Sequence, residues 1–304
     1  MAGINSKTKL LFKLLKTSLS FGIEQIALIW SDRLGRIGLI ILTIMIFVGI
    51  FAPVIAPSGP HEIYRYPDGT LKRMEPPSWA HPFGTTIFGK DVLSQTIWGT
   101  RVTLKIGAIA GIICVFIGTN IGLISGYYGG LIDDILMRIT DVAYALPFLP
   151  TAIVLVAILG TNQWVVILVI AALLWRTSAR TIRSNVLSLR NRPFVEAARN
   201  AGASDLRIMY KEIIPNLLPL IFLFTAFSVC WATIAEVSLS FLGFGDPSVV
   251  SWGRIIFLAF AGQVMRIAWW WFVPPGFAIT LFVTSCFYIG HAYEKVANPR
   301  LETY

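Results

Sequence analysis

Six long apolar stretches dominate the sequence and restrict what it can form. A helix needs about 20 apolar residues to cross the hydrocarbon core of a bilayer, which is about 30 Å thick. Inside that core only helices and closed barrels satisfy all their backbone hydrogen bonds. We therefore expect an all-α membrane protein with six transmembrane helices. The stretches that reach or approach the required length are residues 34–56, 102–126, 138–160, 163–187, 213–242 and 271–290.

Composition supports this class and argues against others. The chain is 56% hydrophobic and 13% charged, whereas an ordinary soluble domain carries about 25% charged residues. The net charge of +9 does not indicate nucleic-acid binding, because Lys and Arg punctuate apolar runs instead of clustering on a soluble module. The three Cys and three His residues lack the spacing of metal ligands, so we expect no metal site.

The distribution of Lys and Arg predicts the orientation. When the connections between spans alternate, most of the 25 basic residues fall on one side, chiefly in the N-terminal segment, the connection from Arg176 to Lys211 and the tail. The positive-inside rule then places both termini in the cytoplasm of a multi-pass cell (plasma or inner) membrane protein, and the loop 57–101 outside. Residues 1–33 form the cytoplasmic N-terminal segment, a basic stretch that suits a helix lying on membrane lipid, with a disordered arm as the alternative. Residues 34–304 form the transmembrane domain.

Residues 84–90, GTTIFGK, have the spacing of a phosphate-binding P-loop up to its last position. A P-loop needs Ser or Thr after the Lys to hold Mg²⁺, and here Asp91 follows Lys90. The segment also falls in the loop expected outside the cytoplasm, away from ATP. We therefore interpret Asp91 as the N-cap of the next helix and expect no ATP to bind here.

The loop between the fourth and fifth stretches predicts two short helices. In RNRPFVEAARNAGASDLRIMYKEIIPNLLP, residues 190–219, Pro193 suits a first helical turn and Gly202 ends the helix. Ser204 or Asp205 caps the next helix. We interpret the unit as a docking element at the membrane surface. An amphipathic helix lying on lipid is the alternative.

This loop resembles the EAA loop of ABC-importer permeases, through Glu196-Ala197-Ala198, Gly202 and Pro215. The chain as a whole is similar to the C-type permease subunit of dipeptide/oligopeptide ABC importers, and only about the first 20 residues lie outside the similarity. Lys90 departs from the Arg usual in that family. The similar blocks, in family order, are FAPVIAP (51–57), PPSWAHPFGT (76–85), GKDVLSQTIWGTRVTLKIG (89–107), GYYGGLIDDILMRITDVAYALP (126–147), EVSLSFLGFG (236–245), SWG (251–253) and ANPR (297–300).

The resemblance implies the type I ABC-importer permease fold, with a cytoplasmic coupling helix and an extracytoplasmic loop between helices 1 and 2. It implies a sister permease subunit, two ABC ATPase subunits that use ATP and Mg²⁺, and an extracytoplasmic solute-binding protein. This chain itself would be no enzyme and bind no cofactor. The implied ATPase-coupling residues are Glu196, Ala197, Ala198, Gly202, Ala203, Asp205 and Pro215.

Few ionisable residues lie in the spans, and such residues are functional candidates because they are costly in lipid. Glu236 lies near the outer end of the fifth span, before a run with Ser240 and Phe241 that resembles the family's gate region. We assign these three residues to the translocation path or gate; a hydrogen bond between packed helices is the alternative for Glu236. Asp141 is a further candidate, and a pair with Arg138 three residues earlier is the alternative. Trp269-Trp270-Trp271 suggests an interface belt.

The expected function is that of the transmembrane subunit of an ATP-driven importer for di- and oligopeptides. The same type of importer carrying oligosaccharides is the alternative, because the binding protein largely sets specificity. A stand-alone secondary transporter fits less well, because the sequence has no internal repeat. An intramembrane enzyme would need a nucleophile or metal constellation, and the spans offer none.

Overall fold

The computed structural model describes residues 26–297, and regular secondary structure in this part is helical, with two isolated β-bridges in the loop before α4. Most of the N-terminal segment 1–33, with its predicted interfacial helix, lies outside the described residues. The elements are α2 (Arg33–Ile50), α3 (Ala52–Ile55), α4 (Val92–Tyr128), α5 (Gly130–Ala145), α6 (Phe148–Leu159), α7 (Gln163–Leu174), α8 (Arg176–Leu189), α9 (Pro193–Asn200), α10 (Asp205–Arg207), the π-helical turn η1 (Ile208–Ile213), α11 (Ile214–Phe241), α12 (Trp252–Ala261) and α13 (Trp269–Ala297).

The described helices provide up to six membrane spans. Four are long and apolar enough by themselves: α2, α4, the run from α10 through α11, and α13. Two further spans are bent pairs, α5 with α6 at 90° and α7 with α8 at 41°. The all-α class is confirmed, but the stretches 138–160 and 163–187 are broken helices instead of straight ones. The first break falls at Pro147, whose ring cannot continue a helix from the residues before it.

Helix α4 is the centre of the bundle and packs against α2, α7, α8, α11 and α13. Glycines along it let neighbouring backbones approach closely, as is common between membrane helices. A Cβ added at Gly111 would lie 2.6 Å from the backbone nitrogen of Val229 on α11, and one at Gly122 would lie 2.5 Å from the carbonyl oxygen of Ala179 on α8. The glycines that form these two seams are Gly107 and Gly111 toward α11, and Gly118, Gly122 and Gly126 toward α8.

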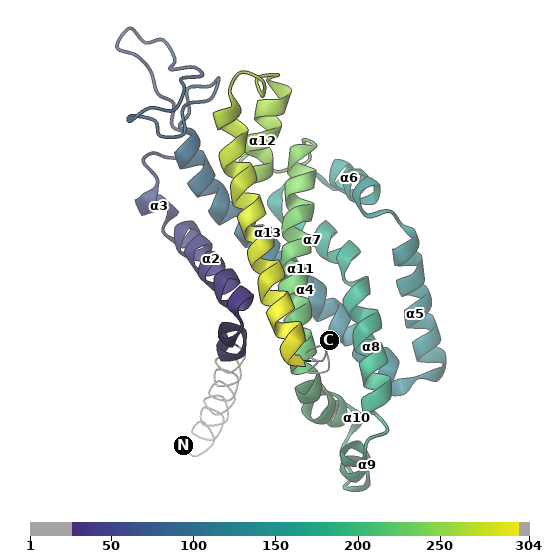
Figure 1. The fold of residues 1–304 in the computed structure, drawn as a ribbon. Helices are drawn as coiled ribbons and strands as arrows, with labels where there is room; N and C mark the ends of the chain where they lie inside the picture. The colour runs from purple at the N-terminus through teal and green to yellow at the C-terminus, as the bar shows by residue number, and fades with distance from the viewer. Residues whose placement is uncertain (1–25, 298–304) are drawn as a thin grey trace, which may run out of the picture.

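The two ends of the bundle carry different connecting elements. The start of α2, the end of α13 and the short helices α9 and α10 lie at one end, the lower end in Figure 1, while the loop 57–91 and α12 lie at the other. This arrangement agrees with the alternating connections that were used to sort the basic residues. The orientation of the bundle relative to the cytoplasm stays a prediction.

Helix α4 begins ten residues before the predicted span 102–126. The prediction left out its first turns because they contain several polar residues. Asp91 is the N-cap, and its Oδ2 accepts hydrogen bonds from the backbone N–H and the hydroxyl of Ser94, both at 2.7 Å. The cap predicted for Asp91 is confirmed. The other carboxylate oxygen lies 3.1 Å from Nδ1 of His81, and both side chains are buried. The motif GTTIFGK is thus the last part of a folded loop that is anchored on the start of α4.

This loop also covers two of the three consecutive tryptophans. Trp271 is completely buried, and Trp270 donates from Nε1 to the carbonyl oxygen of Thr85 at 3.3 Å. Trp269 is 55% exposed. The prediction of an interface belt is therefore wrong for Trp270 and Trp271, because the loop 57–91 packs against them; Trp269 alone of the three keeps an exposed side chain.

Another contact between loops joins the α6–α7 turn to the loop after α11. Asp246 accepts from the backbone N–H of Gln163 at 3.0 Å and from the backbone and hydroxyl of Ser248. Burial acts to raise the pKa of Asp246, but these hydrogen bonds and the nearby charge of Arg254 outweigh it and hold the pKa below its ordinary value. The carboxylate thus fastens two turns together in its ionised form.

Candidate functional site

Helix α9 carries the EAA sequence and presents most of it to solvent. Pro193 occupies the first turn, where the missing N–H costs nothing, and Glu196 lies close to the positive end of the helix. Val195 is completely buried, while Glu196 and Ala197 are exposed and Ala198 is half-buried. One face of this short helix therefore holds it to the protein and the other is free for a partner.

A left-handed glycine makes the turn between α9 and α10. Gly202 has φ +77°, and the N–H of Ala203 donates to the carbonyl oxygen of Ala198 at 3.0 Å. The predicted helix end at Gly202 is confirmed. Ser204 occupies the N-cap position of α10 without a side-chain capping bond. The carboxylate of Asp205 instead accepts a hydrogen bond from the Tyr127 hydroxyl at 2.7 Å, so it ties the loop to α4.

The buried side of the loop joins it to three membrane helices. Val195, Ile208 and Met209 are buried in one apolar cluster. Outside the apolar cluster, the Tyr210 hydroxyl donates to Oδ1 of Asn120 at 2.5 Å. The loop is therefore packed as part of the bundle, and its motion must be shared with the helix ends it touches. The cluster is completed by Leu123 and Tyr127 of α4, Ile182 and Val186 of α8, Ile213 of η1 and Leu217 of α11.

The structure brings the seven predicted coupling residues together at one end of the bundle. Ala203 is half-buried, and Gly202, Asp205 and Pro215 are exposed at the surface of the loop or the start of α11. Their exposure makes them available to another subunit. Contact with an ATPase stays a prediction.

Glu236 and Ser240 lie inside the bundle. The side chain of Glu236 is 1% exposed, and its Oε1 accepts from the Ser240 hydroxyl one turn later at 2.7 Å. Its Oε2 has no hydrogen-bond partner within residues 26–297. Phe241 is half-buried and lies against Phe260 of α12, with ring centroids 5.6 Å apart. The hydrogen bond of Glu236 is thus made within α11 and not to another helix, and the path or gate role of the three residues stays a prediction.

Asp141 pairs with a residue that local spacing did not suggest. Its Oδ1 accepts from Nη2 of Arg180 on α8 at 2.5 Å, and Arg138 is not the partner. The predicted pair with Arg138 is wrong because α5 packs on α8, which brings a guanidinium from 39 residues away into range. The ammonium group of Lys105 lies over the ring of Trp164, 5.3 Å from its centroid.

Three arginines on α8 complete the contact with α5, and they were missed because Arg176 through Lys211 were counted as a cytoplasmic loop. Arg176 donates to the carbonyl oxygen of Ala143 at 2.7 Å. Arg183 holds both oxygens of Asp133 at 2.5 Å. The three arginines follow one another at intervals of four and three residues, which places them on one face of a helix. This spacing, in a stretch expected to be a span, could have predicted their contact with a neighbouring helix.

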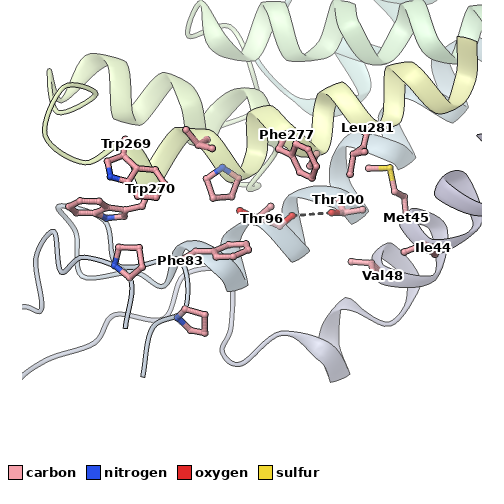
Figure 2. A pocket seen from close by; sticks show the side chains of 15 residues that line it. Ile44, Met45, Val48, Phe83, Thr96, Thr100, Trp269, Trp270, Phe277 and Leu281 are labelled. Carbon is pink, nitrogen blue, oxygen red and sulfur yellow. Dashed lines mark hydrogen bonds between the residues drawn. The ribbon is translucent and has the colours of Figure 1, made fainter. Parts of the chain in front are cut away.

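An apolar cavity opens beside the loop before α4. It has a volume of about 520 Å³ and is walled by α2, α4, α13 and Phe83 of the loop, as Figure 2 shows. Ile44 and Phe277, on opposite walls, are also exposed at the helix surface. The hydroxyls of Thr96 and Thr100 donate to backbone carbonyl oxygens of their own helix. This cavity therefore offers apolar contacts to a lipid chain and little to a polar solute.

Sequence comparisons identify the family. A family model described as "Binding-protein-dependent transport system inner membrane component" matches residues 118–303. A second, described as "N-terminal TM domain of oligopeptide transport permease C", matches residues 29–77. The N-terminal model covers α2, α3 and part of the loop 57–91, and the other covers the bundle from the middle of α4 onward.

Curated relatives match at similar length. A putative peptide transport system permease protein of Brucella suis is 35% identical over 89% of this chain and 89% of its own. The dipeptide transport system permease protein DppC of Alkalihalophilus pseudofirmus is 34% identical over 90% of this chain and 88% of its own. The oligopeptide transport system permease protein OppC of Bacillus subtilis is 33% identical over 95% of this chain and 93% of its own.

Among solved structures, one of the inward-facing MetNI methionine ABC transporter covers 66% of this chain and 96% of its own, with 17% identity and a TM-score of 0.49. The assignment rests on the sequence matches, which span the chain and agree with the all-helical bundle and its membrane spans. The chain belongs to the ABC-transporter permeases of the dipeptide/oligopeptide importer family, as a C-type subunit.

Proposed function

We propose that this chain is one of two permease subunits of an ATP-driven importer that takes up di- and oligopeptides delivered by an extracytoplasmic solute-binding protein. ATP hydrolysis, with its Mg²⁺, takes place on two separate ATPase chains. The observation that carries this proposal is the coupling loop 188–212, which is packed on the membrane helices by one face and exposed by the other.

Coupling in this proposal is mechanical. Closure of the ATPases moves α9, and the buried contacts of Val195, Ile208 and Met209 pass that movement to α4, α8 and α11. Packed short helices move as rigid bodies because close-packed interiors deform little. The Tyr127–Asp205 hydrogen bond adds a polar link to α4 at the same place.

The proposal of a peptide substrate is supported by the relatives of this chain, which include dipeptide and oligopeptide permeases. Oligosaccharides are the competing substrate class. Uptake assays with the binding protein loaded in turn with a tripeptide and with a neutral oligosaccharide distinguish the two. Uptake of the oligosaccharide alone would reject the peptide assignment and leave the permease role intact.

Gly202→Val tests the coupling role. The left-handed φ of Gly202 strains a β-branched side chain, although nothing lies within 4 Å of the added Cβ. We expect normal expression of the variant in the membrane but loss of substrate-stimulated ATPase activity, or loss of the ATPases on purification of the complex.

Gly160→Val is the matched control. Gly160 also has a positive φ, +102°, with open space around the Cβ position, but it lies in the turn between α6 and α7 at the other end of the bundle. We expect this variant to keep its ATPases. Wild-type transport and ATPase stimulation in Gly202→Val would contradict the coupling role.

A further inference from the structure

Two arginines of α8 share one aromatic ring of α5. The guanidinium carbons of Arg176 and Arg180 lie 5.1 Å and 4.0 Å from the ring centroid of Tyr144. Asp141 is the carboxylate that pairs with this group, through Arg180. The cluster therefore carries two positive charges against one negative charge.

Most N–H donors of these two arginines are free to bind a ligand. Within residues 26–297, Arg176 donates one hydrogen bond, to the carbonyl oxygen of Ala143, and Arg180 donates one, to Asp141. A guanidinium has five N–H donors. The side chains of Arg180 and Asp141 are 47% and 50% exposed. The surplus of donors and of positive charge suits a carboxylate, which two N–H groups of a guanidinium bind side by side.

Arg183 on the same helix has a different environment. It holds both oxygens of Asp133, which is 11% exposed and also accepts from the hydroxyl of Ser125. Its charge is balanced by that carboxylate. Arg183 therefore fastens α5 to α8, whereas Arg176 and Arg180 retain binding capacity.

The depth of the cluster requires polar surroundings. Arg176 lies 13 residues after Gln163, where the bent span α7–α8 begins, which places it about 20 Å along the helix. That point is inside a hydrocarbon core about 30 Å thick. Charged groups at such depth face a water-filled cavity or the interior of a bundle, because exposure to lipid is costly.

A cavity adjoins the cluster. It has a volume of about 350 Å³ and lies between the α7–α8 bend and α11. The Tyr144 hydroxyl makes a 3.1 Å hydrogen bond with Oγ1 of Thr177, which lines this cavity together with Ser178. On the other wall are Phe227 and Trp231, the latter 62% exposed. Thr177 thus links this cavity, with its hydroxyls and aromatic side chains, to the ring on which the two guanidinium groups lie.

We propose that Arg176 and Arg180 bind the free C-terminal carboxylate of a short peptide, with the neighbouring cavity accepting an apolar side chain of that peptide. The inference rests on the proposed function and makes it more specific. A peptide amide and a neutral oligosaccharide both lack the carboxylate, so both are poor ligands for this site.

Equilibrium binding to the purified complex of permease pair and ATPases, in nanodiscs without binding protein or ATP, tests the site. The probes are radiolabelled Ala-Phe-Ala, its C-terminal amide and maltotriose. We expect wild type to bind the free tripeptide at least ten-fold more tightly than the amide, and Arg180→Gln and Arg176→Gln to abolish that ratio. Arg180→Lys, which keeps the charge and loses the planar fork, is expected to keep part of it.

Arg138→Gln is the matched control, because Arg138 is an exposed arginine of α5 outside the cluster. It is expected to leave the ratio unchanged, and thermal unfolding of each complex verifies the fold. An unchanged ratio in both Arg180→Gln and Arg176→Gln, or tighter binding of maltotriose than of the tripeptide, would overturn the site. Uptake of peptide by the wild-type complex with its binding protein and ATP tests the proposed function separately.

Discussion

Replacing Gly122 with alanine is expected to weaken the seam between α4 and α8. The added Cβ would lie 2.5 Å from the carbonyl oxygen of Ala179 and 2.9 Å from the backbone nitrogen of Arg183. Carbon atoms normally stay about 3.5 Å or more from their neighbours. Because both contacts are with backbone, no side-chain rotation relieves them and the helices must move apart.

The magnitude follows from two opposed effects. Overpacking of this kind costs about 1–3 kcal/mol. Alanine in a helix interior returns about 1 kcal/mol relative to glycine. At Gly276 of α13 a Cβ would have nothing within 4 Å, so Gly276→Ala receives the gain without the cost. The free energies of unfolding of the two variants should therefore differ by the overpacking cost, about 1–3 kcal/mol, with Gly122→Ala the less stable.

Reversible unfolding by SDS in mixed micelles measures that difference on the isolated chain. A seam that loosens at Gly122 also lies beside Leu123, which belongs to the apolar cluster under the coupling loop. We therefore expect Gly122→Ala to reduce ATPase stimulation in the assembled importer as well. Equal stability of Gly122→Ala and Gly276→Ala would refute the close approach of α4 and α8.

Three further changes test other parts of the structure. Asp91→Ala removes the N-cap of α4, worth about 0.5–2 kcal/mol, and it also removes the partner of buried His81. The free energy of unfolding should therefore fall. Asp91→Asn, the control, should retain most of the cap. Glu236→Gln keeps an acceptor for Ser240 and should preserve the fold; unaltered uptake of every substrate would remove Glu236 from the path candidates. The lowered pKa of Asp246 stabilises the fold at neutral pH, and this contribution should be lost as the pH falls through that pKa, so acid should lower the melting temperature of wild type more than that of Asp246→Asn.

The sequence predicted the elements that depend on local chemistry. The length of the apolar stretches predicted the spans, Pro193 and Gly202 predicted where α9 begins and ends, and Asp91 was predicted as the N-cap of α4. These features require only neighbouring residues, so no tertiary knowledge is needed. The six predicted stretches agree with the upper number of spans that the described helices provide, in which each bent pair counts as one span.

The errors arose where distant segments meet. The first turns of α4 are polar and were left out of its span, although the loop 57–91 buries them. The same loop covers Trp271. Arg138 was the partner considered for Asp141, but α5 packs on α8 and the observed partner is Arg180 of α8. Periodicity cannot reveal a partner that is brought in by packing.

Helix α8 connects the two proposed functional elements. Its last turns, at Ile182 and Val186, lie in the cluster under the coupling loop, and its first turns carry Arg176 and Arg180. The glycines of α4 let α8 pack closely, with the side chains of Ile182 and Val186 seated over Gly122 and Gly126, so we expect a movement of the loop to shift α8.

Such a shift would act unequally on the two ion pairs that hold α5 to α8. The Arg180–Asp141 pair is half-exposed, and pairs of this kind contribute only about 0–1 kcal/mol. The Arg183–Asp133 pair is bidentate and better shielded, so it resists separation. Movement of the coupling loop should therefore open the outer pair first and pivot α5 about the inner one. Opening in that order would free Arg180 from the carboxylate of Asp141 when the ATPases act. The affinity of Arg176 and Arg180 for a substrate carboxylate would then change during the transport cycle.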